Sequence, residues 1–339
     1  MEYLPSEIQL KILKYLHFDD LLEIRQVNRY FYDFTVKHNL VRKKFIDLFF
    51  LTPSLIETQL SNFYYMPGKD FQSLKAVNIP VSNYLQNKWS SAIKKRNPVF
   101  IVKNPDVYRA PILALDGGGN FIGKALRLPF YPKNIKELKI IRYWLNQIFN
   151  FDYAYIHFKE AIFNPEIIKL LFDSEEISKI KLSCDWAVFN FNNQHFNVLK
   201  STLDYMSITQ KVDINFDYIN TTEEDNDFIL KLLLNENYRI PEVVLRYPTD
   251  SQIVIYNNLV NHLETSIDLS NVVAKIMFCL AHWDASKLVV RGVEINESST
   301  EDKRYKIKNI HHPQMQFAIS FIEDARGSIN NIKIDKINS

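Results

Sequence analysis

The sequence is short of glycine and cysteine, and each shortage excludes a class of protein. It has seven glycines in 339 residues, too few for a fold built on several glycine-rich loops, and four of the seven lie between Gly117 and Gly123. Its two cysteines, Cys184 and Cys279, cannot form a disulfide framework. Thiols without a framework are typical of a reducing compartment, so we expect a cytoplasmic and/or nuclear location.

Long apolar runs and net charge are also lacking. The apolar stretch from Val272 to Ala281 is interrupted by Lys275 and falls far below the ~18 residues of a membrane helix. No cationic segment followed by an apolar one stands at the start, so no secretory signal is predicted. The 41 Lys and Arg residues nearly balance the 39 Asp and Glu residues, leaving a net charge of +2. We therefore expect neither nucleic acid nor a membrane as partner.

What the sequence does have is the composition of a folded protein. Apolar residues make up 47% and charged residues 24%, which excludes disorder for most of the chain. The length is sufficient for roughly two domains with a real hydrophobic core.

The first fifty residues have the clearest pattern. Ser6 and Gln9 have the spacing of a capping box, which predicts a helix from about Glu7 to residues 17–18. Asp19 or Asp20 can cap a second short helix, and Asn28 a third that continues to about Phe50. Three such helices bury too little surface alone, so we expect them to dock on an apolar partner.

This pattern resembles the F-box, the helical module that binds a Skp-type adaptor and thereby a cullin-based ubiquitin ligase. The opening Leu4-Pro5-x-Glu7-Ile8 and the steps Asp20-Leu21-Leu22 and Val27-Asn28-Arg29 carry the resemblance. Two positions depart from the usual motif: Phe31 stands where Trp is common, and Leu40-Val41 where Leu-Trp is common. The resemblance implies these adaptor-binding residues: Leu4, Pro5, Ile8, Ile12, Leu16, Leu21, Leu22, Val27, Asn28, Phe31 and Tyr32. The competing interpretation is an N-terminal helical cap whose aliphatic residues face the chain's own core.

The rest of the chain divides by pattern. After the F-box at 1–48, residues 49–97 have the pattern of a helical linker, and short strands begin near residue 98. From residue 98 to 339 we predict an α/β repeat-like domain that binds a protein target. Its candidate strands begin at Tyr153, Lys179, Tyr205 and Glu242 and alternate with helices over residues 164–172, 194–203, 224–234 and 253–263.

This spacing of one strand and one helix favours a degenerate solenoid similar to leucine-rich repeats, with an ordinary α/β sandwich as the alternative. Four antiparallel strands are predicted for the end of the chain, over residues 287–294, 305–310, 314–321 and 328–337. The fold class is therefore α+β or α/β. The whole layout, including residues 132–142 and 310–317, also resembles the expanded F-box families of plant-parasitic nematodes.

Residues 116–124 are the one stretch that suggests an enzyme. Gly118 to Lys124 has the Gly-x4-Gly-Lys spacing of a phosphate loop, but Ala125 replaces the magnesium-binding hydroxyl and Pro129 is too close for a helix. The Asp-Gly-Gly-Gly sequence resembles that of patatin-like lipases, yet no Gly-x-Ser-x-Gly exists. We interpret the stretch as a β-hairpin with a glycine tip and keep a hydrolase or nucleotide-binding enzyme as the alternative function.

Other chemistry is weakly indicated. Cys279-x-x-His282 with Cys184 or His311-His312 could supply zinc ligands, but the second spacing is missing, so a buried core cysteine is favoured. We interpret Glu175-Glu176 and Glu223-Glu224-Asp225 as acids at helix starts. We predict no catalytic residue, no metal and no cofactor: the sequence predicts a non-catalytic substrate-recognition subunit that binds a Skp-type adaptor and an unknown protein substrate.

Overall fold

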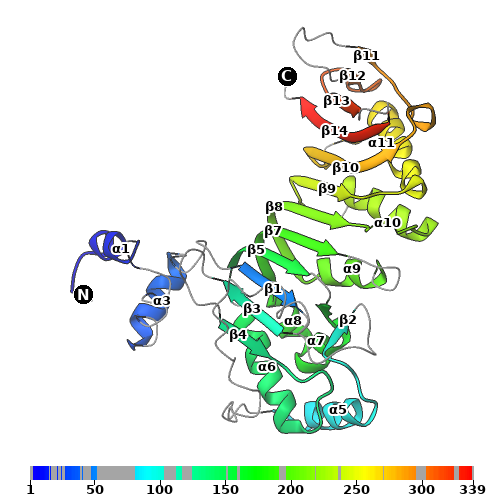
Figure 1. Cartoon of the computed structure of the whole chain (residues 1–339). Coiled ribbons are helices and arrows are strands. Elements are labelled where there is room, and N and C mark those ends of the chain that lie inside the picture. The colour runs from blue at the N-terminus through cyan, green and yellow to red at the C-terminus, as the bar shows by residue number, and fades with distance from the viewer. Residues whose placement is uncertain are drawn as a thin grey trace.

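The computed structural model in Figure 1 describes most of the chain. The described residues are 3–14, 16, 21, 24, 27–38, 40, 47–51, 81–102, 112–116, 124–149, 152–158, 161–190, 196–217, 219–235, 238–269, 271–294, 303–323 and 328–337. Residues 52–80 of the predicted helical linker and the predicted glycine tip at 117–123 lie outside them.

A single large mixed sheet organises the chain. Its 12 strands lie in the order β11-β12-β13-β14-β10-β9-β8-β7-β5-β1-β3-β4. The strands are β1 (Asp47–Leu51), β3 (Ile112–Asp116), β4 (Lys124–Arg127), β5 (Asp152–Phe158), β7 (Leu182–Asn190), β8 (Met206–Asn215), β9 (Glu242–Arg246), β10 (Lys275–Trp283), β11 (Val293–Glu294), β12 (Lys303–Lys308), β13 (Gln316–Glu323) and β14 (Ile329–Ile337). β2 (Phe100–Val102) and β6 (Ala161–Phe163) form a separate two-stranded sheet.

The helices lie before and between the strands. They are α1 (Ser6–Lys14), α3 (Arg29–Lys37), α5 (Asn83–Lys94), α6 (Ile135–Phe149), α7 (Pro165–Leu171), α8 (Ser174–Lys179), α9 (Phe196–Leu203), α10 (Glu223–Leu233) and α11 (Ile253–Thr265), with short 3₁₀ turns at Asp250–Gln252 and Ala285–Lys287. In the described part of the chain, no helix combines the length and apolar character that crossing a membrane requires.

The middle of the sheet is parallel and follows the order of the chain. β5, β7, β8, β9 and β10 are neighbours in that sequence and pair in parallel. Figure 1 shows these strands as a twisted strip with α9, α10 and α11 along one side. Parallel neighbours need a crossover, and the helices between the strands supply it.

The core lies between this sheet and its helices. One row of paired residues crosses the parallel strands as Ile156, Ala187, Val212, Val243 and Ile276, and all five are fully buried. They belong to the same hydrophobic cluster as buried helix residues such as Leu199, Leu232 and Leu259. The apolar stripes of the helices and one face of the sheet therefore make one core.

Two helix starts have both a capping box and the acids that the sequence predicts there. Asp173 and Glu176 form a capping box at α8, and Thr222 and Asp225 form one at α10. The acids at these starts are helix N-terminal residues, as the sequence predicts. One strand begins later than predicted. The strand expected from Lys179 begins at Leu182, because α8 continues to Lys179.

Most predicted strands are confirmed within a few residues. β5, β8 and β9 begin within one residue of the predicted starts at Tyr153, Tyr205 and Glu242. β12, β13 and β14 are antiparallel and extend the sheet beyond β10. The predicted strand over 287–294 is reduced to Val293–Glu294. Residue 287 belongs to a 3₁₀ turn, and residues 288–292 are outside regular secondary structure.

One prediction about the N-terminal region is wrong. The third helix was expected to continue to about Phe50, but α3 ends at Lys37 and Asp47–Leu51 forms β1. β1 pairs in parallel with β5 and antiparallel with β3, so residues distant in sequence determine its conformation. Residues 47–51, at the end of the N-terminal region, are therefore part of the large sheet.

The division at residue 97 stays a prediction, although α5 shares the core of the sheet. Trp89 of α5 is fully buried in the same hydrophobic cluster as the strands, and its indole nitrogen donates a hydrogen bond to the Leu170 carbonyl at 2.8 Å. Leu85 and Ala92 lie in that cluster too. A cut at residue 97 would remove these side chains from the core.

Candidate functional site

The residues predicted to bind an adaptor fall into two structural classes. Leu21 and Phe31 are buried, and Ile12, Leu16 and Asn28 are half-buried. Leu4, Pro5, Ile8, Val27 and Tyr32 are exposed. Leu22 lies outside the described residues. The buried members cannot contact a partner without unfolding, so the exposed members are the ones most accessible to it.

The helices of this region have a small core of their own. Leu13, Leu21 and Phe34 form it, with Leu16 and Leu40 packed against it. Leu13 was not among the residues predicted to bind the adaptor, and its place in this core shows only in the structure. Leu40 is at one of the two positions that depart from the F-box motif, and it contributes to this core.

Gln9 connects the start of α1 with α3. Its side chain is buried, Nε2 donates to the Leu4 carbonyl at 2.6 Å, and Oε1 accepts from the Tyr30 hydroxyl at 2.9 Å. The predicted capping box is wrong in detail. Ser6 is already inside α1, and the backbone N–H of Gln9 donates to the Pro5 carbonyl. Asn28 caps α3 as predicted, accepting from the Phe31 amide at 3.0 Å.

Tyr30→Phe tests this connection. Removing one hydrogen bond to a buried side chain is expected to lower the stability of the α1–α3 unit by about 1 kcal/mol. The measurement is amide hydrogen exchange of α1 and α3 by mass spectrometry. Tyr3→Phe is the matched control, because Tyr3 is fully exposed. Equal exchange rates in the two variants would contradict the role given to Gln9.

The exposed apolar side chains of this region form a candidate docking surface. Leu4 is 40% exposed, Ile8 43% and Val27 68%, and Tyr30 and Tyr32 are also exposed. Isolated exposed apolar residues are ordinary, whereas a surface that binds another protein gathers several of them. We call Leu4, Pro5, Ile8, Val27 and Tyr32 the predicted adaptor-binding surface.

The flanks of the glycine-rich stretch are strands. β3 and β4 pair antiparallel, with Leu115 opposite Lys124, as expected of a hairpin. Lys124 begins β4, whereas the lysine of a phosphate loop stands at the start of a helix whose amides bind the phosphate. The geometry at Lys124 therefore does not support nucleotide binding.

The two cysteines lie inside the fold. Both are buried, and burial raises the pKa of the Cys184 thiol and of the Cys279 thiol above the ordinary value. Among the described residues, no three His, Cys, Asp or Glu side chains gather as metal ligands would. The interpretation of Cys279 as a core residue fits its burial.

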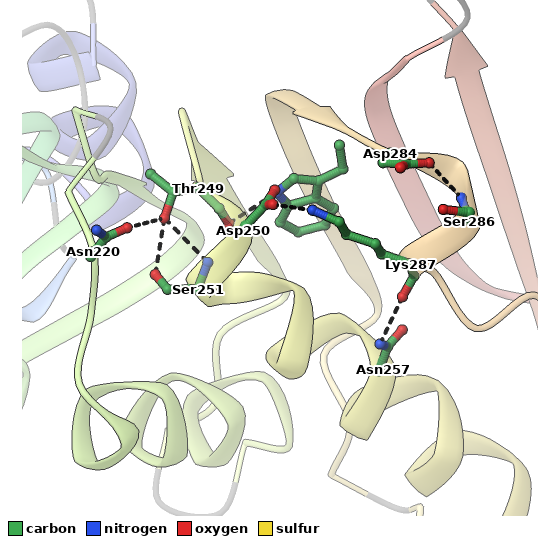
Figure 2. A network of polar contacts seen from close by, with 9 residues as sticks. Asn220, Thr249, Asp250, Ser251, Asn257, Asp284, Ser286 and Lys287 are labelled. Atoms are coloured by element: carbon green, nitrogen blue, oxygen red, sulfur yellow. Dashed lines mark hydrogen bonds and ion pairs between the residues drawn. The ribbon is translucent and has the colours of Figure 1, made fainter.

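A polar network links three successive loops at the carboxyl ends of the parallel strands (Figure 2). Thr249, after β9, donates to Asn220, after β8, at 2.8 Å. Trp283, at the end of β10, donates from its indole nitrogen to the Thr249 carbonyl at 3.0 Å. Lys287 pairs with Asp250. These contacts satisfy polar groups by joining each loop to the next, so we assign the network a structural role.

Two family profiles match the chain. One, described as F-box-like, matches residues 1–47, and one described as Domain of unknown function (DUF8381) matches residues 72–217. No curated protein and no solved structure matches the chain. Residues 1–47, which contain the predicted adaptor-binding surface, are therefore an F-box-like region. The second match includes α5 and ends after β8.

Proposed function

We propose that this chain is the substrate-recognition subunit of a Skp–cullin–F-box ubiquitin ligase. The observation that carries the proposal is the coincidence of the F-box-like match with the exposed apolar residues of the predicted adaptor-binding surface. A Skp-type adaptor would cover those residues and connect the chain to a cullin. The rest of the chain, centred on the large sheet, would bind the protein target.

Adaptor binding is the direct test. Titration of a purified Skp-type adaptor into the full chain, followed by calorimetry, is expected to give one-to-one binding with micromolar or tighter affinity. Co-elution of the two proteins in gel filtration is the second readout. Failure of a folded chain to bind any of several Skp-type adaptors would overturn the proposal.

The repeat-like interpretation of the target-binding part belongs to this proposal. It is supported by the consecutive order of the parallel strands β5, β7, β8, β9 and β10 and by the contacts of Figure 2, which join the segments after β8, β9 and β10 to one another. We also propose a cytoplasmic and/or nuclear location and a place among F-box proteins similar to the expanded nematode families. We do not propose a hydrolase or nucleotide-binding enzyme on residues 116–124, since Lys124 begins a strand and nothing in the described residues favours that function.

The chain would act by proximity and supply no catalytic group. F-box proteins are generally non-catalytic adaptors, and holding target and ligase together raises their effective concentration. A nucleophilic thiol needs an accessible thiolate, whereas burial keeps Cys184 and Cys279 protonated.

The thiols provide a separate prediction. When the full chain is mixed with activating enzyme, charged conjugating enzyme and ubiquitin, no ubiquitin adduct sensitive to thiol reductants is expected on the chain. Non-reducing gel electrophoresis is the measurement, and the Cys184→Ser and Cys279→Ser variants are the controls. An adduct that disappears in either variant would show a thiol-dependent enzyme.

A further inference from the structure

The sheet has a second face whose composition differs from that of the core. Next to the buried row of Ile156 and Ala187 lies a row that crosses the strands as Tyr155, Trp186, Lys211, Glu242, Lys275 and Asp335. Side chains alternate across a strand, so this row faces away from the helices. We call three rows together the open face: this row, the row through Asp213 and the row through Arg246.

Trp186 is the largest exposed side chain of the row, with 36% of its surface accessible. Tyr155 contacts its ring edge-on at a centroid distance of 5.0 Å, and the Lys211 ammonium lies 4.7 Å from the ring centroid. Both neighbours hold the indole in place. Tryptophan is one of the residues enriched among the anchors of protein interfaces.

A β-bulge places Trp186 in this position. Between the pair Cys184–Ile208 and the pair Trp186–Lys211, β8 has one residue more than β7. A β-bulge interrupts the hydrogen-bond ladder between two strands and redirects side chains, and such bulges are frequent next to active sites. Here the break lies between Cys184, which is buried, and Trp186, which is exposed although residues two apart in a strand ordinarily share a face.

The part of the open face from β7 to β12 holds the positive charge of the chain. Over these strands its three rows have six cationic residues, Lys211, Arg246, Lys275, Arg304, Lys306 and Lys333. Over the same strands they have three carboxylates, Asp213, Glu242 and Asp335, so six minus three gives +3. On the other side of Tyr155 the first row continues to Asp47 and Asp116, so the cationic part begins at Trp186 and extends toward β12. The whole chain has only +2, so the remainder is about neutral. A partner attracted here is acidic.

The carboxylates of the open face indicate whether its partner is a peptide or a nucleic acid. Glu242 lies between Lys211 and Lys275 and pairs with both, at 3.4 and 3.0 Å. Asp213 pairs with Arg246. A phosphate backbone would meet a carboxylate beside each of these cations, whereas a polypeptide can present acidic side chains only where the face is cationic.

We infer that the open face, anchored by Trp186, binds an acidic, extended segment of a target protein. This inference rests on the proposed function, because it names the surface and the chemistry by which the substrate-recognition subunit recognises its substrate. The indole provides an apolar contact for the segment, and the surrounding lysines pair with its carboxylates. Binding is then expected to weaken as salt concentration rises.

The experiment measures binding of the full chain to an array of 15-residue peptides whose acidic, basic and apolar content varies. Peptides rich in Asp and Glu that also contain an apolar residue are expected to bind best. Trp186→Ala is expected to weaken their binding about 30-fold, as is typical of an interface anchor. Lys211→Glu/Lys275→Glu is expected to shift the preference to basic peptides.

The controls separate this inference from the function it rests on. Tyr84→Ala removes an equally aromatic, exposed side chain from α5 and is expected to leave peptide binding unchanged. Trp186→Ala is expected to bind the adaptor as the wild type does. No preference for acidic peptides, a folded Trp186→Ala variant with full affinity, or tighter binding of a uridine-rich RNA than of any peptide would each overturn the inference. Adaptor binding that persists in that case would leave the proposed function standing.

Discussion

The Leu4→Ala/Ile8→Ala variant is expected to lose at least about 30-fold of its affinity for a Skp-type adaptor. Each side chain is roughly 40% exposed in the chain alone, so neither change removes core packing. Anchors at the centre of an interface typically contribute about 1–3 kcal/mol each, and 2 kcal/mol in total already gives about 30-fold. Calorimetric titration of the adaptor is the measurement.

Two comparisons make this result specific. Leu13→Ala removes a fully buried side chain of the α1–α3 core and is expected to reduce adaptor binding by unfolding that unit, which hydrogen exchange detects. Tyr84→Ala changes an exposed aromatic residue outside the F-box-like region and is expected to bind normally. If Leu4→Ala/Ile8→Ala keeps its affinity while Leu13→Ala loses it, the fold of the unit matters but the surface assigned here does not.

Local pattern predicted the parts of the fold that depend on neighbouring residues. Helix starts at Asn164 and Thr222 follow from their own side chains and those of the next turn. β1 could not be predicted in this way, because residues 47–51 pair only with β3 and β5, more than sixty residues away. An apolar run of that length is compatible with a helix or a strand until its partners are known.

The candidate sites show the same division. Motif residues identified the F-box-like region, but the sequence could not say which of them are exposed: Leu21 is core, and Leu4 is surface. Trp186 gave no signal at all, since a tryptophan in a mostly apolar stretch of sequence is ordinarily core. Its exposure depends on a bulge in the pairing of β7 with β8, and pairing register is a property of the tertiary structure.

The second large effect is expected at Asp213, a carboxylate whose side chain is only 2% exposed on the open face. The Arg246 Nε donates to both of its oxygens, at 2.9 and 2.8 Å. Removing one partner of a buried pair leaves an uncompensated charge. Arg246→Met is therefore expected to lower the free energy of unfolding at pH 8 by about 3 kcal/mol, the lower end for such pairs because Arg246 is partly exposed. Urea unfolding, followed by the fluorescence of the buried tryptophans, is the measurement.

The sign of the pH dependence identifies Asp213 as the cause. Burial raises the pKa of the Asp213 carboxyl, although hydrogen bonds from Arg246 and the charges of Arg246 and Lys211 act to lower it, and Arg246→Met removes most of that compensation. A carboxyl with a raised pKa in the folded state stabilises the fold below its unfolded pKa, and this contribution is lost as pH rises through the folded pKa. The deficit of Arg246→Met is thus expected to be largest at pH 8 and to shrink toward pH 5.

Two control variants separate the charge of Asp213 from other effects. Arg246→Met/Asp213→Asn cannot titrate at this position, so its stability relative to the wild type is expected to vary less with pH. Lys231→Met, which breaks an exposed pair with Asp227, is expected to cost less than about 0.5 kcal/mol. A deficit in Arg246→Met that is the same at pH 5 and pH 8 would mean that Arg246 stabilises the sheet by packing, and that Asp213 is neutral in the folded chain.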